Sequence, residues 1–171
     1  TILEGFSYFD LPERNAKPRQ SGINVLVDRG IPLKTLENAL SYHKHIDVLE
    51  IGPEALISND LQKRVSLCKK LNITPFLSGI VFEAFLKRDK FDGYMELCEK
   101  NQIDTFMVSD GCVTIHPSEK CSYIEKLARI GTVYSKVGSK DPAYIIPPYK
   151  WIELMRSELE CGSKYVFAES K

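Results

Sequence analysis

Short apolar runs alternate with amphipathic stretches along nearly the whole chain. Five of the runs end in glycine, serine or a charged residue just before a helical pattern begins, and a sixth starts close to the end of the sequence. They are INVLVDRG (23–30), VLEIG (48–52), PFLSG (75–79), TFMVSDG (105–111), TVYSKVG (132–138) and KYVFAESK (164–171). Because they recur every 25 to 32 residues, the pattern predicts repeated βα units that form a parallel sheet.

The number of repeats predicts an α/β protein of the (β/α)8 TIM-barrel type, here an incomplete barrel of about six βα units. A closed barrel usually needs about 250 residues, whereas this chain has 171. Either the sheet is open, or the chain is most of a barrel without its last two units. We expect a single domain over residues 1–171, with residues 1–21 as an N-terminal arm that lacks sustained periodicity.

The apolar spacing also places the individual elements. The predicted strands are Ile23–Val27, Val48–Ile51, Thr74–Leu77, Thr105–Val108 and Thr132–Lys136, with a sixth from residue 164. The predicted helices begin at Pro32 and near Asn59 or Asp60, and cover Glu83–Lys87, Phe91–Lys100, Tyr123–Ile130 and Trp151–Cys161. The first strand is almost wholly apolar, which indicates burial on both of its faces.

Charge and composition narrow the class of partner. The chain has 23 basic and 23 acidic residues and a net charge of +0, which argues against a nucleic-acid backbone or an anionic membrane as the main partner. Its 5 cysteines show no CxxC spacing, so disulfide and metal sites are weakly indicated. We expect a cytoplasmic protein.

Charged residues cluster where the predicted strands end. Parallel sheets place their chemistry at the carboxyl ends of the strands. The charged residues there or just beyond are Asp28, Glu50, Glu83, Asp110, Lys136, Lys140 and Glu169.

Several of these strand ends lie in motifs that resemble one known family. The motifs are KPRQSGINVLVDRG (17–30), FLSGIVFEAF (76–85), VSDG (108–111), SKVGSKDP (135–142) and ECGSKYVFAESK (160–171). Together, from about Lys17 onward, they resemble the phosphosulfolactate synthase family. The resemblance implies a (β/α)8 barrel that adds sulfite to phosphoenolpyruvate with Mg²⁺ and gives (2R)-2-phospho-3-sulfolactate. This reaction begins coenzyme M biosynthesis in archaea and leads to sulfolactate in some bacilli.

The resemblance and the chemistry together suggest roles for the strand-end residues. Mg²⁺ prefers oxygen ligands, for which the candidates are Glu83, Glu169 and Asp110. Lys140 would donate a proton or clamp the substrate carboxylate, with Glu83 also a catalytic candidate. The substrate-binding candidates are Lys17, Arg19, Asp28, Ser109, Asp110 and Lys171, the last standing where the family has arginine.

Each of these roles has a structural alternative. Glu83 could stabilise the first turn of its helix, where a carboxylate is favourable in any protein. Lys140 could be a loop lysine paired with Asp141. The KPR segment that holds Lys17 and Arg19 is often simply a charged surface, and an aspartate such as Asp28 is commonly used to form a turn.

Four strand-end positions depart from the family pattern. Glu50 stands where the family has lysine, Lys136 and Met107 stand where it has glutamate, and Ser78-Gly79-Ile80 replaces a Gly-Gly-Thr run. Because Glu50 and Lys136 reverse two charges at once, they form a hypothetical coupled pair at the catalytic end of the barrel. Independent drift in a site no longer used is the alternative.

Two classes of function therefore remain open. The first is a phosphosulfolactate synthase-like lyase that acts on phosphoenolpyruvate and sulfite. The alternative is a catalytically altered paralogue or a fragment, which acts on another enol phosphate or binds without catalysis. Exposed strand edges would favour pairing with another chain, so a homo-oligomer is left open.

Overall fold

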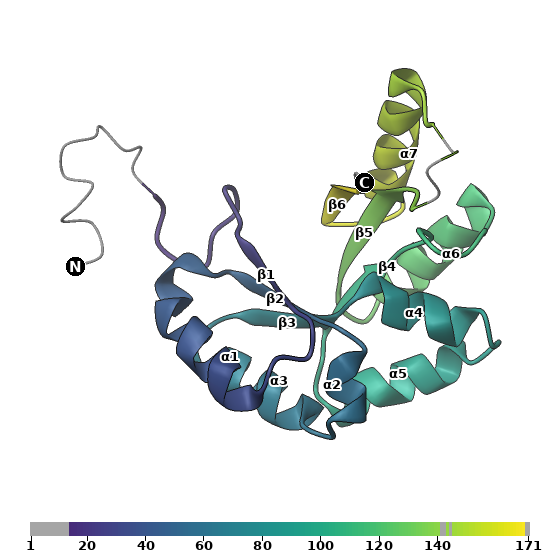
Figure 1. Ribbon diagram of the computed structural model, residues 1–171. Helices are drawn as coiled ribbons and strands as arrows, with labels where there is room; N and C mark the ends of the chain where they lie inside the picture. Colours follow the sequence, from purple (N-terminus) through teal and green to yellow (C-terminus); the bar gives the residue numbers. More distant parts are fainter. Residues whose placement is uncertain (1–13, 141–142, 144, 170–171) are drawn as a thin grey trace.

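The computed structural model describes residues 14–140, 143 and 145–169. The strands line the inner side of an arc and the helices cover its outer side (Figure 1). The elements are, in order, β1 (Val25–Asp28), α1 (Leu33–Ala39), the 3₁₀ helix η2 (Leu40–His45), β2 (Val48–Ile51), α2 (Glu54–Ile57), α3 (Leu61–Lys70), β3 (Thr74–Leu77), α4 (Gly79–Leu86), α5 (Phe91–Lys100), β4 (Thr105–Val108), α6 (Pro117–Ala128), β5 (Thr132–Gly138), α7 (Pro148–Glu160) and β6 (Tyr165–Glu169).

The six strands form two parallel sheets, ordered β1-β2-β3 and β4-β5-β6. This confirms the predicted α/β fold with parallel strands of a partial TIM-barrel type. β3 and β4 are neighbours but share no hydrogen-bonded ladder. Thr74 N and Ser78 N donate to the carbonyls of Asp47 and Ile51, before and at the end of β2, at 2.9 and 2.8 Å. Because successive backbone nitrogens alternate in direction along a strand, Pro75 directs its nitrogen toward β4. It has no N–H to offer there, which contributes to the division of the sheet.

Apolar side chains fill both sides of the strands. A large cluster between strands and helices includes Leu36, Leu49 and Phe82. A smaller cluster on the inner side contains Val48, Phe76, Met107 and Tyr134, where the Phe76 and Tyr134 rings meet edge to face at 5.5 Å. β2 and β4 are buried at every position, as their mainly apolar sequences predict.

The first strand differs from its prediction. β1 is an edge strand, and its Val27 is 48% exposed. The expectation that this strand is buried on both faces is therefore wrong, because no described strand pairs with its outer edge. Val25 of β1 and Tyr165 of β6 line a shared apolar groove of about 150 Å³ on the open inner side.

Three helices begin earlier than the sequence pattern indicates. α4 begins at Gly79, four residues before the predicted start, and α6 and α7 begin at Pro117 and Pro148. The short helix α2 was not predicted. Asp60 is the N-cap residue of α3, but its carboxylate makes no capping hydrogen bond. It binds Arg64 instead, at 2.7 Å, and that hydrogen bond holds the pKa of Asp60 below its usual value.

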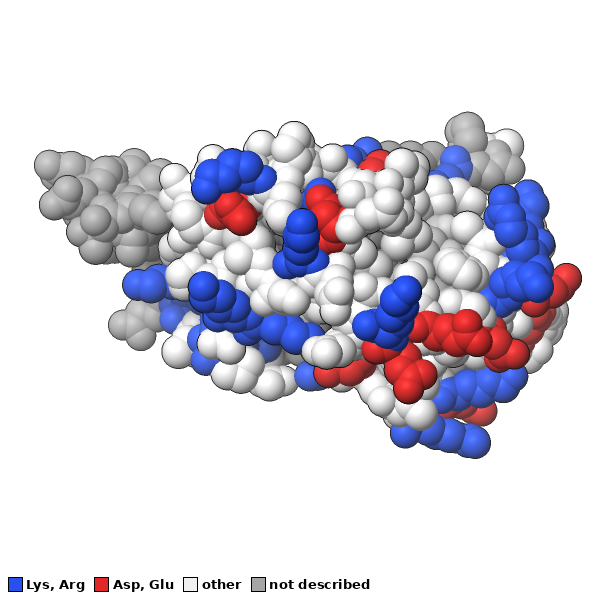
Figure 2. Space-filling model, turned by 90° about the horizontal axis from the view of Figure 1, so that it is seen from below, with Lys and Arg blue, Asp and Glu red and all other residues white. Residues whose placement is uncertain are grey.

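The outer surface carries mixed charge. On the face shown in Figure 2, acidic and basic side chains lie interspersed with neutral ones. Within the described residues, every helix is too short or too polar to cross a lipid bilayer.

A buried ion pair joins β1 to α3. Arg64 Nη1 lies 2.5 Å from Asp28 Oδ2, and the two side chains are 1% and 0% exposed. Arg64 Nη2 also donates to Ile31 O at 2.8 Å. The loop after β1 is therefore fixed to the helix layer by one guanidinium group.

Replacing Arg64 by methionine should lower the free energy of unfolding by about 3–5 kcal/mol, because Asp28 would keep a buried charge without its partner. Urea denaturation of the parent and of Arg64→Met at one pH measures the difference. Lys63→Met, at the exposed neighbouring position, is the matched control. Equal stabilities for the two variants would contradict a structural role for this pair.

Candidate active site at the carboxyl ends of the strands

Glu83 holds the loop that follows β4. Its carboxylate accepts hydrogen bonds from Ser109 Oγ, from Gly111 N at 3.1 Å and from Cys112 N at 2.7 Å. The residue is 2% exposed, and a buried carboxylate needs such donors. The alternative that Glu83 stabilises the first turn of its helix is wrong, because α4 starts at Gly79 and has no acidic residue in its first turn.

Glu169 and Lys140 approach the same loop from the ends of β6 and β5. Lys140 Nζ lies 3.9 Å from Glu169 Oε1, and Lys140 N donates to Gly111 O at 3.3 Å. A methyl group at Gly111 would lie 2.8 Å from Glu169 Oε2, 3.7 Å from Lys140 Cε and 3.8 Å from Glu83 Oε1. Three of the residues selected from the sequence therefore gather around one glycine.

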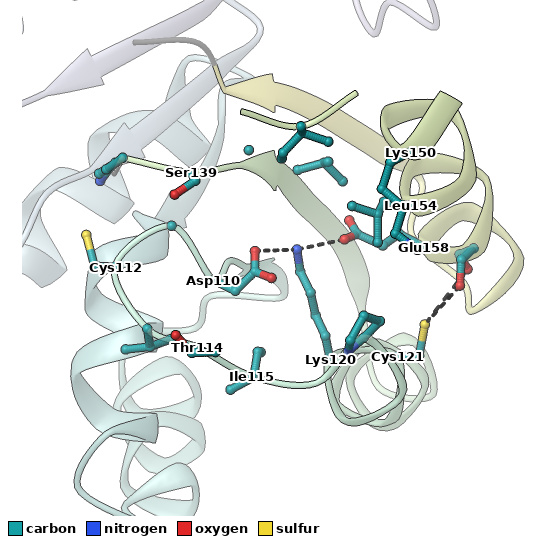
Figure 3. A pocket seen from close by; sticks show the side chains of 18 residues that line it. Asp110, Cys112, Thr114, Ile115, Lys120, Cys121, Ser139, Lys150, Leu154 and Glu158 are labelled. Atoms are coloured by element: carbon teal, nitrogen blue, oxygen red, sulfur yellow. Dashed lines mark hydrogen bonds and ion pairs between the residues drawn. The ribbon is translucent and has the colours of Figure 1, made fainter. Parts of the chain in front are cut away.

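Asp110 is turned toward a different group, Lys120 of α6. Lys120 Nζ contacts Asp110 Oδ1 at 2.7 Å, Glu158 Oε1 at 2.6 Å and Lys136 O at 2.5 Å (Figure 3). Lys120 is 3% exposed and Glu158 is 4% exposed. One buried ammonium thus ties the loop after β4 to β5 and α7. Burial raises the pKa of Glu158, while Lys120 acts in the opposite direction.

An ion pair between Glu50 and Lys136 joins the two sheets. Lys136 Nζ of β5 lies 2.8 Å from Glu50 Oε1 of β2. The side chains are 16% and 10% exposed, so each charge is largely removed from water. The contact that the reversed charges predicted is present in the structure.

Lys17 and Arg19 lie at the opposite end of the strands. Lys17 Nζ donates to Ile46 O at 2.6 Å, and Arg19 Nη1 lies 2.6 Å from Asp47 Oδ1. These partners directly precede Val48, the first residue of β2. The prediction that Lys17 and Arg19 bind substrate together with the other site residues is therefore not supported, because the arm enters at the amino end of the sheet.

Asp28 also makes its contacts outside the candidate site. Besides its pair with Arg64, its Oδ1 accepts hydrogen bonds from Gly30 N at 3.0 Å and Ile31 N at 3.2 Å. With 1% exposure, it forms the turn after β1 and does not face the site. Lys171 lies outside the described residues.

The chain is similar to proteins of one known family. A model of the (2R)-phospho-3-sulfolactate synthase (ComA) family matches residues 12–171. This chain belongs to the phosphosulfolactate synthase family. It is 30% identical to the phosphosulfolactate synthase of Bacillus subtilis (strain 168) over 95% of its length, and 27% identical to that of Methanothermobacter thermautotrophicus over 95%. The phosphosulfolactate synthase of Methanocaldococcus jannaschii is 29% identical over 89%. The chain spans 66%, 66% and 63% of these three relatives.

The arrangement fits a magnesium ion only in part. Among the described residues, no three His, Cys, Asp or Glu side chains form a metal-binding group. The predicted set of Glu83, Glu169 and Asp110 is thus not assembled, because Glu83 is bound by the loop and Asp110 by Lys120. Glu169 Oε2 is buried and accepts no hydrogen bond. It fits a site with one protein carboxylate, completed by water and substrate oxygens as Mg²⁺ commonly allows.

Lys120, Glu158 and Arg64 were not selected from the sequence. Arg64 and Glu158 lie on predicted helices, where charged residues are usually exposed. Lys120 precedes the predicted helix start at Tyr123, because α6 begins earlier, at Pro117. Lys120 and Glu158 are 38 positions apart, so the sequence gave no local signal of their pairing. Arg64, in contrast, could have been recognised by Asp60, four positions earlier.

Exchanging the charges of Glu50 and Lys136 together should be better tolerated than either single change. Glu50→Lys or Lys136→Glu alone would place two like charges in contact and cost about 3–5 kcal/mol of unfolding free energy. The double variant restores an opposite-charge pair, so its loss should be smaller than either single loss. Urea denaturation of the four proteins gives the coupling free energy.

The exposed pair Lys34 and Glu37, 3.1 Å apart, supplies the control cycle. Its charge exchange should show no measurable coupling, since surface pairs contribute little. Additive losses at Glu50 and Lys136 would show that their contact does not couple the two sheets.

Glu158 should make stability depend on pH. Its native pKa is raised above 4.5, so the native state binds the proton more tightly than the unfolded state does. Ionised Glu158 therefore destabilises the fold as pH rises through the native pKa. The difference in unfolding free energy between Glu158→Gln and the parent should shift in favour of the variant between about pH 4 and about pH 8. Urea titrations across that range test this, with exposed Glu160→Gln as the control; a difference that is constant with pH would refute it.

Proposed function

We propose that this protein is a phosphosulfolactate synthase-like lyase that adds sulfite to phosphoenolpyruvate, with Mg²⁺, to give (2R)-2-phospho-3-sulfolactate. The observation that carries the proposal is the convergence of Glu83, Glu169 and Lys140 around Gly111. They come from α4, β6 and the loop after β5, at the strand ends where barrels of this type hold their substrates. A location in the cytoplasm and self-association stay predictions.

The proposed reaction forms one carbon–sulfur bond and moves one proton. The sulfur lone pair of sulfite attacks C3 of phosphoenolpyruvate, and the C2–C3 π electrons move to C2 and into the adjacent carboxylate. A proton then adds to C2, and no oxidant or reductant is needed. Lys140 Nζ is the proton donor in this proposal, because its side chain is 48% exposed and reaches the site and an ammonium can supply the proton.

The charges of the site explain why a metal ion is part of the proposal. Lys136 is paired with Glu50, and Lys140 lies 3.9 Å from Glu169. Glu83 adds a further negative charge, so these carboxylates outnumber these lysines. Two anionic substrates would be repelled unless a cation were added. Mg²⁺ held by Glu169 would stabilise the negative charge that develops beside the carboxylate during addition.

The second candidate function is a catalytically altered family member that acts on another enol phosphate or only binds its ligand. The Glu50–Lys136 pair favours it, because a lysine neutralised by a glutamate at 2.8 Å attracts a substrate anion less strongly. Because the chain spans only about two thirds of the length of its relatives, the activity of the whole protein is a proposal as well.

The test is an assay of phosphoenolpyruvate and sulfite with Mg²⁺, using the protein as its gene encodes it and phosphorus NMR to follow the product. Glu169→Gln should lower kcat at least about tenfold and raise the Mg²⁺ concentration needed for half-maximal rate. Lys140→Ala should lower kcat by about 10²–10⁴ with a smaller change in KM, as expected for loss of a proton donor.

Matched exposed residues serve as controls. Glu160 and Lys126 lie on the surfaces of α7 and α6, and the variants Glu160→Gln and Lys126→Ala should leave kcat and KM unchanged. No turnover by the unaltered protein at any Mg²⁺ concentration would reject the lyase proposal and favour the second candidate. Full turnover by Glu169→Gln would reject the assigned role of that residue.

A further inference from the structure

A pocket of about 610 Å³ opens beside the candidate active site, between α6 and α7 (Figure 3). Gly111 and Lys140 line it, and both also belong to the cluster around Glu169. The pocket and the cluster are therefore adjoining parts of one site. The buried Lys120 group lies at the pocket wall, where its three contacts hold the neighbouring elements together.

The pocket and the cluster around Gly111 share Lys140. The cluster brings Glu83 and Glu169 together with Lys140, so it suits a cation. In the pocket wall, Lys120 binds Asp110 and Glu158, and Lys150 lies 2.6 Å from Glu153. Lys140 stands at the boundary, and an anion in the pocket would lie beside it.

The pocket is also larger and more apolar than a three-carbon acid requires. Half-buried Ile115, Ile146 and Leu154 line it together with buried Val137. A water molecule takes up about 30 Å³ in the liquid, so the pocket has space for many more groups than phosphoenolpyruvate contains. Pockets of this size with apolar walls and a few polar groups are typical of ligands that carry an apolar part.

We propose that the pocket between α6 and α7 is the specificity compartment of the site, and that it takes the apolar substituent of an organic phosphate-carboxylate whose anionic head lies beside Lys140. The inference rests on the proposed function only for the place of the head. It goes beyond that function by assigning to this protein a ligand larger than phosphoenolpyruvate.

Two unreactive probes with the same anionic head test the compartment directly. They are 2-phospholactate and 2-phospho-3-phenyllactate, with binding measured by titration calorimetry in the presence of Mg²⁺. Burial of the phenyl group should make the second probe bind at least about tenfold more tightly. Its binding should also show the more negative heat-capacity change, which marks burial of apolar surface.

Variants of α7 locate the bound substituent. Leu154→Trp should remove the advantage of the phenyl probe and leave the affinity for 2-phospholactate unchanged, because the added ring fills the pocket. Ile152→Trp, at a 58% exposed position of the same helix, should change neither affinity. Ile115→Trp, in the loop after β4, repeats the test from the other wall if Leu154→Trp does not fold.

The outcomes separate this inference from the proposed function. Equal affinities for the two probes, or no binding of either, would overturn the compartment even if phosphoenolpyruvate and sulfite are converted. A phenyl advantage that survives both tryptophan variants would overturn it as well. Selective binding of the phenyl probe without turnover of phosphoenolpyruvate would uphold the compartment and reject the reaction.

Discussion

Every charge beneath the carboxyl ends of these strands needs a partner, because burial removes the water that would otherwise solvate it. Arg64 neutralises Asp28, backbone amides bind Glu83, and Lys136 meets Glu50. Each of these contacts joins elements that are distant in the sequence. The same requirement that stabilises the charges therefore fixes the loops and sheets that surround the site.

The loop after β4 shows how this constraint produces a site. Glu83 binds the amides of Gly111 and Cys112, and Lys140 N donates to Gly111 O. Lys120 holds Asp110, the residue next to Gly111. The loop is thus restrained by helix α4, helix α6 and the loop after β5. Glu169 faces this restrained loop, and its Oε2 accepts no hydrogen bond. Restraint of the surrounding groups is what keeps a binding site in one geometry.

The sequence was sufficient for the positions of the strands and for the end of the sheet at which Glu83, Lys140 and Glu169 converge. Short, mainly apolar runs at regular spacing, such as Val48–Ile51, are typical of buried parallel strands in an α/β protein. The convergence of Glu83, Lys140 and Glu169 could be predicted from the sequence, because parallel strands have their carboxyl ends on one side of the sheet. The partners of the buried charges could not be predicted, because pairs such as Lys120 with Glu158 depend on which helices become neighbours. Lys17 and Arg19 were predicted to bind substrate, but they lie at the amino end of the sheet. A segment that precedes β1 naturally meets that end of the strand.

The Glu50–Lys136 ion pair and the contacts of Lys120 share one residue, Lys136. Lys136 lies in β5, where its carbonyl oxygen accepts a hydrogen bond from Lys120 Nζ while its own ammonium contacts Glu50. One residue thus connects the ion pair between the two sheets with the Lys120 contacts at the wall of the pocket between α6 and α7. A glutamate at position 136 would leave Glu50 facing a like charge across 2.8 Å, so the two substitutions must occur together if the fold is to keep its stability. The Glu50–Lys136 contact thus gives one physical reason for the two charges that the resemblance marks as reversed, because it joins the two sheets.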